Sequence, residues 1–223
     1  MFRFVMSILQ CSIPISFYVI SSTKSNNIFN YTMNAITYNI TIPDGSYTAI
    51  SLKTKLQSLT LLTISFDSDS NKFTFSNSLY DFTINSATTC YNQIGFYNLA
   101  YSSVSKSLTS VRGIDLAGSR FLYIYCNNIH TSNIDSYSGQ ISGLIWAIPL
   151  EIDSFSVLNY TNSSNYHTLI YDSIISTLKI KIYDDDHDLI VLDHDWCMTI
   201  EMHLIVDKSY QMRNALTHSE EEK

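Results

Sequence analysis

Aspartate and histidine side chains are concentrated near the C-terminus, where they could bind a metal ion or serve an enzyme. Residues 184–188 are Asp-Asp-Asp-His-Asp, and Asp193, His194 and Asp195 follow shortly after. Carboxylates and imidazoles together form metal sites, but the same residue types are common in tight turns. We favour turns, because metal-binding histidines need partners held on rigid elements and these residues lie at predicted loop tips.

A second acidic segment, residues 67–71, begins like a calcium-binding loop with the order Asp-Ser-Asp-Ser-Asn. Such a loop needs glycine at its sixth position for a sharp bend and a bidentate glutamate at its twelfth. Lys72 and Ser78 stand at those positions. We therefore interpret residues 67–71 as the turn of a β-hairpin and expect no bound calcium.

Enzyme motifs with a known mechanism are absent from the sequence. It contains no GxSxG, HExxH, GxxxxGK or GxGxxG pattern, so no reaction and no cofactor is predicted. The net charge is −7 and the basic residues are scattered, which argues against direct binding of nucleic acid. No apolar run is long enough to predict a membrane-spanning helix.

The four cysteines, Cys11, Cys90, Cys126 and Cys197, are far apart and form no CxxC pair, so a zinc site is not expected. Cys126 and Cys197 lie in strand-like segments. They are interpreted as small core residues. The alternative is a disulfide between them, if their strands are neighbours.

Three tyrosines are the candidate binding residues. Tyr137, Tyr160 and Tyr166 fall in or next to two polar segments, residues 127–139 and 153–165, which are predicted to be long loops. Exposed aromatic rings can stack on sugars or anchor a partner protein. Singly exposed tyrosines are also common on protein surfaces that bind nothing.

The elements that would position these residues are mostly β-strands. Apolar and polar residues alternate in segments 4–22, 36–42, 62–75, 81–85, 121–126 and 144–152. Residues 48–59 instead have apolar residues at helical spacing after a capping Thr48, which predicts a helix. A shorter helix is predicted over residues 88–94, ended by Gly95.

Residues 169–205 contain two alternating runs separated by the acidic stretch. This pattern predicts a long antiparallel hairpin that closes a β-sandwich. The residues predicted to share its core face are Trp196, Met198, Ile200, Met202 and Leu204. The predicted fold is mainly β: a jelly-roll-type antiparallel sandwich formed by residues 1–35 and 113–208. Residues 36–112 are predicted to form a small inserted α+β module, and residues 209–223 a charged tail.

Several phrases in this order resemble virion structural proteins of virophages, polinton-like viruses and related large DNA viruses. The similar pattern runs from an Ile-Pro strand through TIPxGxY and DLxGxxxLYI segments to a final DxxGxxIxLxxxDWxxTIE segment. The phrases occupy residues 11–22, 25–31, 38–56, 64–77, 90–96, 108–127 and 183–202. One departure is that His187 and Asp188 stand where the pattern has a turn glycine.

This resemblance implies a non-enzymatic minor capsid or vertex (penton-type) component with a jelly-roll sandwich. It also implies a homo-oligomer, a pentamer or trimer, that meets a major capsid protein in the virion. No catalytic residue can be carried over from the pattern. The alternative is a spike or adhesin that binds a host glycan or receptor through the loops bearing Tyr137, Tyr160 and Tyr166.

Overall fold

The chain folds into two compact units that are each built mainly from antiparallel β-strands. The computed structural model describes residues 2–133, 143–152, 155–172, 174–192 and 194–206. Residues 1–17 and 119–223 belong to one unit, the sandwich, and residues 18–118 form the other, the module. Within the described residues there is one α-helix, and it is too short to cross a membrane. The predicted mainly-β class is confirmed.

One sheet of the sandwich is organised around its first strand, β1. Strand β14 pairs with one side of β1, and β11 and β12 pair with successive parts of its other side. The strands of this sheet are β1 (Phe2–Pro14), β11 (Val157–Thr161), β12 (Thr168–Ile170) and β14 (Cys197–Val206).

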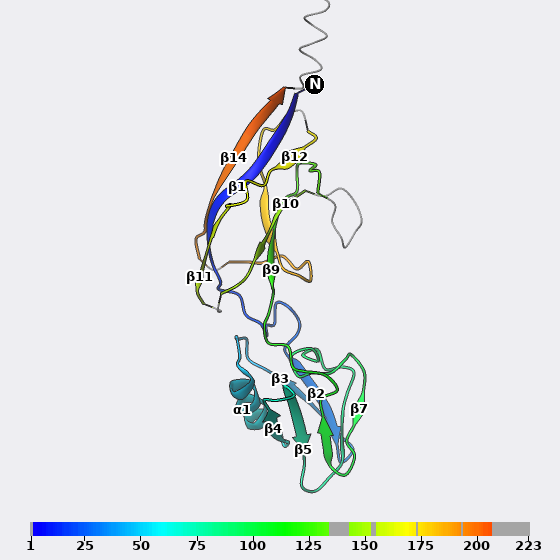
Figure 1. Ribbon diagram of the computed structural model, residues 1–223. Helices are drawn as coiled ribbons and strands as arrows, with labels where there is room; N and C mark the ends of the chain where they lie inside the picture. Colours follow the sequence, from blue (N-terminus) through cyan, green and yellow to red (C-terminus); the bar gives the residue numbers. More distant parts are fainter. Residues whose placement is uncertain (1, 134–142, 153–154, 173, 193, 207–223) are drawn as a thin grey trace, which may run out of the picture. The chain divides into compact units, whose positions relative to one another are not determined.

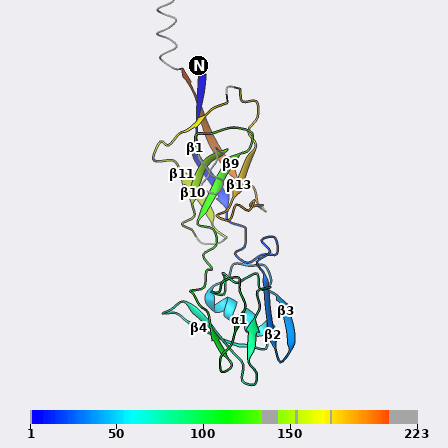
Figure 2. The ribbon, with the colours of Figure 1, turned by 90° about the vertical axis from the view of Figure 1, so that its right-hand side faces the viewer.

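A second sheet of three strands covers the inner face of the first. It has the order β10-β9-β13, with β9 (Phe121–Cys126) between β10 (Leu144–Pro149) and β13 (Ile180–Tyr183). Met6 and Ile13 of β1 and Leu122 and Ile148 of this sheet are fully buried in one core. In the view of Figure 2, β9, β10 and β13 overlie β1 and β11. The two sheets therefore form an antiparallel β-sandwich.

The predicted C-terminal hairpin is wrong. β13 pairs with β9 in one sheet, whereas β14 pairs with β1 in the other. The acidic stretch does turn the chain back on itself, with Tyr183 bridged to Leu189 and Ile190 N donating to Ile182 O. This pairing is short, and the residues beyond it lead to the other sheet, so the long hairpin does not form. Alternation in a sequence shows which side chains share a face, but it does not specify the partner strand.

The module contains two small sheets and the helix around a core rich in aromatic rings. One sheet has the order β3-β2-β6-β7 and the other β4-β5-β8. The elements are β2 (Ile28–Met33), β3 (Ile36–Thr41), α1 (Ala49–Leu59), β4 (Thr63–Asp67), β5 (Lys72–Ser76), β6 (Phe82–Ile84), β7 (Tyr101–Ser102) and β8 (Ser107–Thr109). Phe29 and Tyr31 pack with Phe75 beneath the buried Leu52 and Leu56 of α1.

The predicted helix is present and begins as expected. Thr48 Oγ1 accepts a hydrogen bond from Ser51 N at 3.2 Å, and Ser51 Oγ accepts one from Thr48 N at 2.9 Å. This reciprocal capping satisfies two N–H groups at the helix start. The predicted helix over residues 88–94 is instead a single turn, in which Phe96 N donates to Tyr91 O and Gly95 adopts a φ of 81°.

The boundaries of the module also differ from those predicted. Strand β2, which the sequence assigned to the sandwich, pairs along its whole length with β3, from Ile28 opposite Thr41 to Met33 opposite Ile36. The chain therefore passes between the units near residues 17–18 and 118–119, not near 35 and 113. The predicted tail, residues 209–223, lies outside the described residues.

Candidate interaction surface

An aromatic cluster joins edge strands of the two sheets of the sandwich. Trp146 lies on β10, and its ring centroid is 4.2 Å from that of Tyr166 and 6.4 Å from that of Tyr160 on β11. Both pairs are tilted, with interplanar angles of 43°, and the Trp146–Tyr166 contact is the closer of the two. The cluster thus closes one side of the sandwich and leaves part of Tyr166 exposed.

Tyr166 is held in place by a loop that interrupts the pairing of β1 with β11 and β12. Asn162 N donates to Leu9 O, and the side chain of Asn162 bonds both Tyr166 N and Tyr166 O. The Tyr166 hydroxyl donates to Asn133 Oδ1 at 2.9 Å. These bonds fix the loop backbone, so the Tyr166 ring is presented in one orientation.

The three predicted tyrosines have different positions in the structure. Tyr166 is 38% exposed in a loop, as expected. Tyr160 lies within β11 rather than in a loop, and its burial raises the pKa of its hydroxyl. Tyr137 lies outside the described residues. Sequence reasoning missed Trp146, because its place in an alternating strand gave no sign that it would meet the two tyrosines.

The acidic stretch forms a turn whose carboxylates bind the backbone. Asp184 is fully buried, and its Oδ1 accepts hydrogen bonds from Asp186 N and Asp188 N. The carboxylate of Asp185 accepts from the N–H groups of Arg120 and Phe121, at 2.6 and 3.2 Å. Asp185 thereby fixes the chain where it enters β9.

In this turn His187 adopts the backbone conformation for which the virion-protein pattern has a glycine. Its φ of 62° lies in the left-handed region, which costs a non-glycine residue about 1 kcal/mol. Its ring packs edge-on against Tyr123 and Tyr125, with centroids 5.9 and 6.4 Å away. Such aromatic contacts contribute about 0.5 to 1.5 kcal/mol, the same order of magnitude as the backbone cost.

No group of three metal-ligating side chains is found within the described part of the chain. His194 is exposed, and Asp193 lies outside the described residues. The carboxylates of Asp184 and Asp185 instead accept hydrogen bonds from backbone N–H groups and so stabilise the local fold. This arrangement supports the interpretation of the stretch as a turn.

Strand β14 is an edge strand among the described residues. It pairs there only with β1, so no described strand pairs with the hydrogen-bonding groups on its other side. Met198 and Ile200 pack on the core as predicted. Met202 and Leu204 were predicted to share that face, but they and Ile205 are 38% to 53% exposed, because the strand extends past the core. Natural proteins usually protect such an edge with proline, lysine or a covering element. This strand is the candidate assembly surface.

Two predictions for the start of this strand are wrong. Trp196 precedes β14 and is 39% exposed, so it does not face the core. Cys197 is also exposed and lies opposite Ser12, whereas Cys126 is buried in the other sheet. Both cysteines are free, so the alternative disulfide does not form.

The chain shares its fold with a protein of known structure. No family model matches the sequence, and no curated protein matches it. The crystal structure of a selenomethionine-labelled mavirus penton protein matches with a TM-score of 0.51 and 12% identity. The match covers 91% of this chain and 89% of that chain. Because neither unit alone makes up 91% of the chain, the likeness includes residues of both units.

Proposed function

We propose that this chain is a virion structural protein of the penton type, which assembles through its sandwich. The observation that carries the proposal is the fold shared with a penton protein across both units. The ordered phrases in the sequence support the same role. A jelly-roll sandwich leaves edges and end loops free for neighbouring subunits.

The chain acts as a closed homo-oligomer, a pentamer or trimer, that contacts a major capsid protein in the virion. Closed assemblies repeat the same contact in every subunit, so a modest surface is used several times. The open edge of β14, with exposed Met202, Leu204 and Ile205, is suited to such a contact. The role requires no catalytic residue, cofactor or direct contact with nucleic acid.

Co-assembly tests this proposal. The purified chain is mixed with the major capsid protein encoded in the same genome, and particles are isolated by gradient centrifugation. We expect the chain to sediment with the particles at a fixed stoichiometry and to label their vertices in electron micrographs. A chain that stays at the top of the gradient contradicts a capsid role.

A receptor-binding role is the second candidate, and the rigidly held Tyr166 favours it. Its ring is partly exposed, and its hydroxyl and backbone are both hydrogen-bonded. Binding of the chain to host cells or to a glycan array, lost in Tyr137→Ala or Tyr166→Ala, supports this role. If the wild-type chain binds neither host cells nor any glycan on the array, the receptor-binding role is ruled out.

A further inference from the structure

Four loops meet at one end of the module. Met33 of β2 lies opposite both Ile36 and Phe82, which places the β2–β3 turn beside the start of β6. Ser76, at the end of β5, lies opposite both Thr63 and Ser107. The α1–β4, β5–β6 and β7–β8 connections therefore lie at the same end, where β2 and β5 finish in Figure 1.

Each of these loops carries a large exposed apolar or aromatic side chain, or is followed directly by one, as the β2–β3 turn is by Ile36 at the start of β3. The exposed fractions range from 45% to 78%. We call this set the apolar tip. Its members are Ile36, Leu61, Leu79, Tyr80 and Val104. Clustered exposure of this kind marks an interaction site more often than scattered apolar residues do.

Several backbone groups of the tip are hydrogen-bonded within the protein. Asn77 Oδ1 accepts from Leu79 N and Tyr80 N, both at 2.9 Å. Leu61 N donates to the hydroxyl of Tyr31, and Asn77 Nδ2 donates to Leu61 O. These N–H groups therefore have acceptors within the protein and do not depend on hydrogen bonds to water.

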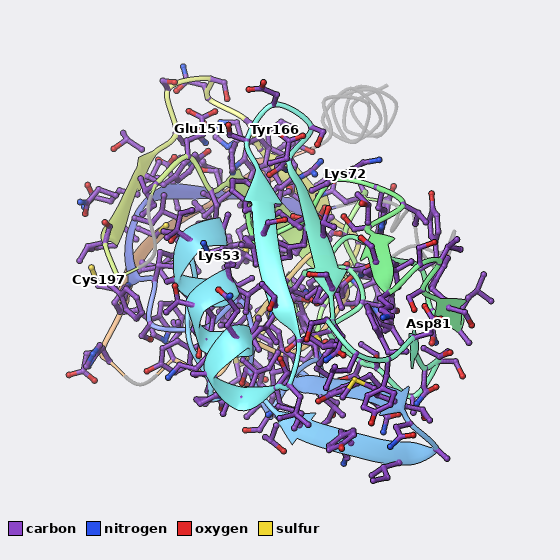
Figure 3. All side chains as sticks on the ribbon, turned by 90° about the horizontal axis from the view of Figure 1, so that it is seen from below. Lys53, Lys72, Asp81, Glu151, Tyr166 and Cys197 are labelled. Carbon is purple, nitrogen blue, oxygen red and sulfur yellow. The ribbon has the colours of Figure 1, made fainter. Side chains whose placement is uncertain are left out.

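The turn that carries Val104 is equally well bonded. Val104 and Ser107 exchange two backbone hydrogen bonds, and Lys106 N donates to Asp81 Oδ1 at 2.7 Å. Asp81, labelled in Figure 3, also accepts from Ser103 Oγ. Lys106 Nζ donates to Ser78 O. The charged side chains of Lys106 in this turn and of Asp81 in the β5–β6 loop are therefore both engaged locally.

Charge is distributed unevenly between the units. Residues 18–118 contain six basic and five acidic side chains, whereas the rest of the chain contains seven basic and fifteen acidic ones. The module is thus almost neutral, and its end loops carry no basic cluster. The charges at this end of the module therefore give no strong electrostatic attraction to phosphates or anionic lipids.

We propose that the apolar tip inserts into the interfacial region of a zwitterionic lipid bilayer. Side chains on separate loops can enter the headgroup and acyl boundary without a shape-matched pocket. Internal hydrogen bonds lower the cost of moving backbone groups out of water, and the N–H groups of Leu79, Tyr80 and Lys106 have such bonds. Tyr80 adds an aromatic ring, a side chain enriched at membrane interfaces.

Flotation with phosphatidylcholine vesicles tests this proposal on the full chain. We expect the wild-type chain to float with the vesicles, and the bound fraction to be unchanged when the salt concentration rises. The double variant Leu79→Ser/Val104→Ser should lose binding several-fold. Its melting curve should match that of the wild type, because both side chains are largely exposed.

The matched control changes two exposed apolar residues of the sandwich, Val157→Ser and Ile174→Ser. This control should bind vesicles as the wild type does. Absence of wild-type flotation, as expected if the tip serves a protein partner instead, overturns the proposal. Binding only to anionic vesicles, or an equal loss in the control, also overturns it. The test does not depend on oligomer formation, so its failure leaves the penton-type role standing.

Discussion

The ring of Tyr166 packs on the indole of Trp146, with centroids 4.2 Å apart. Tyr166→Ala should therefore expose the indole and lower the free energy of unfolding by about 1 to 2 kcal/mol. Fluorescence measured in a Trp196→Phe background isolates Trp146, the other tryptophan of the chain. We expect a red shift of its emission maximum.

Tyr166→Phe is the matched control, because it removes only the hydroxyl that donates to Asn133. This variant should keep the emission of Trp146 and cost about 0.5 to 1 kcal/mol. Identical emission in the wild type and Tyr166→Ala would show that the two rings do not pack in solution.

Trp196 should tolerate truncation. The alternating pattern placed it in the core, where Trp196→Ala would cost about 3 to 5 kcal/mol. Because the side chain is 39% exposed and precedes β14, we expect a loss below about 1 kcal/mol in chemical denaturation. Leu122→Ala, at a fully buried position of β9, is the comparison and should cost about 2 to 5 kcal/mol. Equal losses would contradict the structure.

Cysteine reactivity should be confined to one side chain. Burial raises the pKa of Cys11 to about 11 and that of Cys90 to about 12, so neither forms the reactive thiolate near neutral pH. Cys126 is buried as well, whereas Cys197 is exposed. Brief treatment with iodoacetamide followed by mass spectrometry should find one adduct, on Cys197. The Cys197→Ser variant should remain unlabelled, and rapid labelling of Cys126 would disprove its burial.

Asp172 should contribute to stability only while it is ionised. The backbone N–H of His130 donates to its carboxylate, and this bond together with the imidazole lowers the pKa of Asp172. Because the folded pKa is lower than the unfolded value, the stabilisation is present above about pH 4 and is lost as the pH falls further.

Urea denaturation measured from pH 7 to pH 2 checks this expectation. The stability of Asp172→Asn should fall less steeply at acid pH than that of the wild type. His130→Ala keeps the backbone donor and should retain most of the wild-type slope. Parallel curves for the wild type and Asp172→Asn would refute the assigned role.

Local patterns in the sequence were sufficient to predict many elements but not their partners. Thr48 defined the start of α1, and the alternation of residues 121–126 defined β9, because caps and strand faces depend on neighbouring residues. The partner of β14 is β1, nearly 200 residues away, and no local pattern encodes that distance. The predicted hairpin failed for this reason.

At the candidate site, too, local features were predictable from the sequence, whereas contacts between distant segments were not. The exposed position of Tyr166 followed from the polar residues around it, but its packing on Trp146 depends on the two sheets of the sandwich. Tyr160 was assigned to a loop because polar residues precede and follow its short strand. Trp196 was assigned to the core because the alternation was extended past the first residue of β14.

The solution mass of the chain tests the proposed assembly most directly. Light scattering coupled to size exclusion, across a concentration series, should give a closed species of five or three chains. Leu204→Glu, on the exposed edge of β14, should shift the mass toward one chain, and Ile174→Glu should leave it unchanged. A wild-type mass of one chain, 25.4 kDa, at every concentration would contradict assembly through the sandwich.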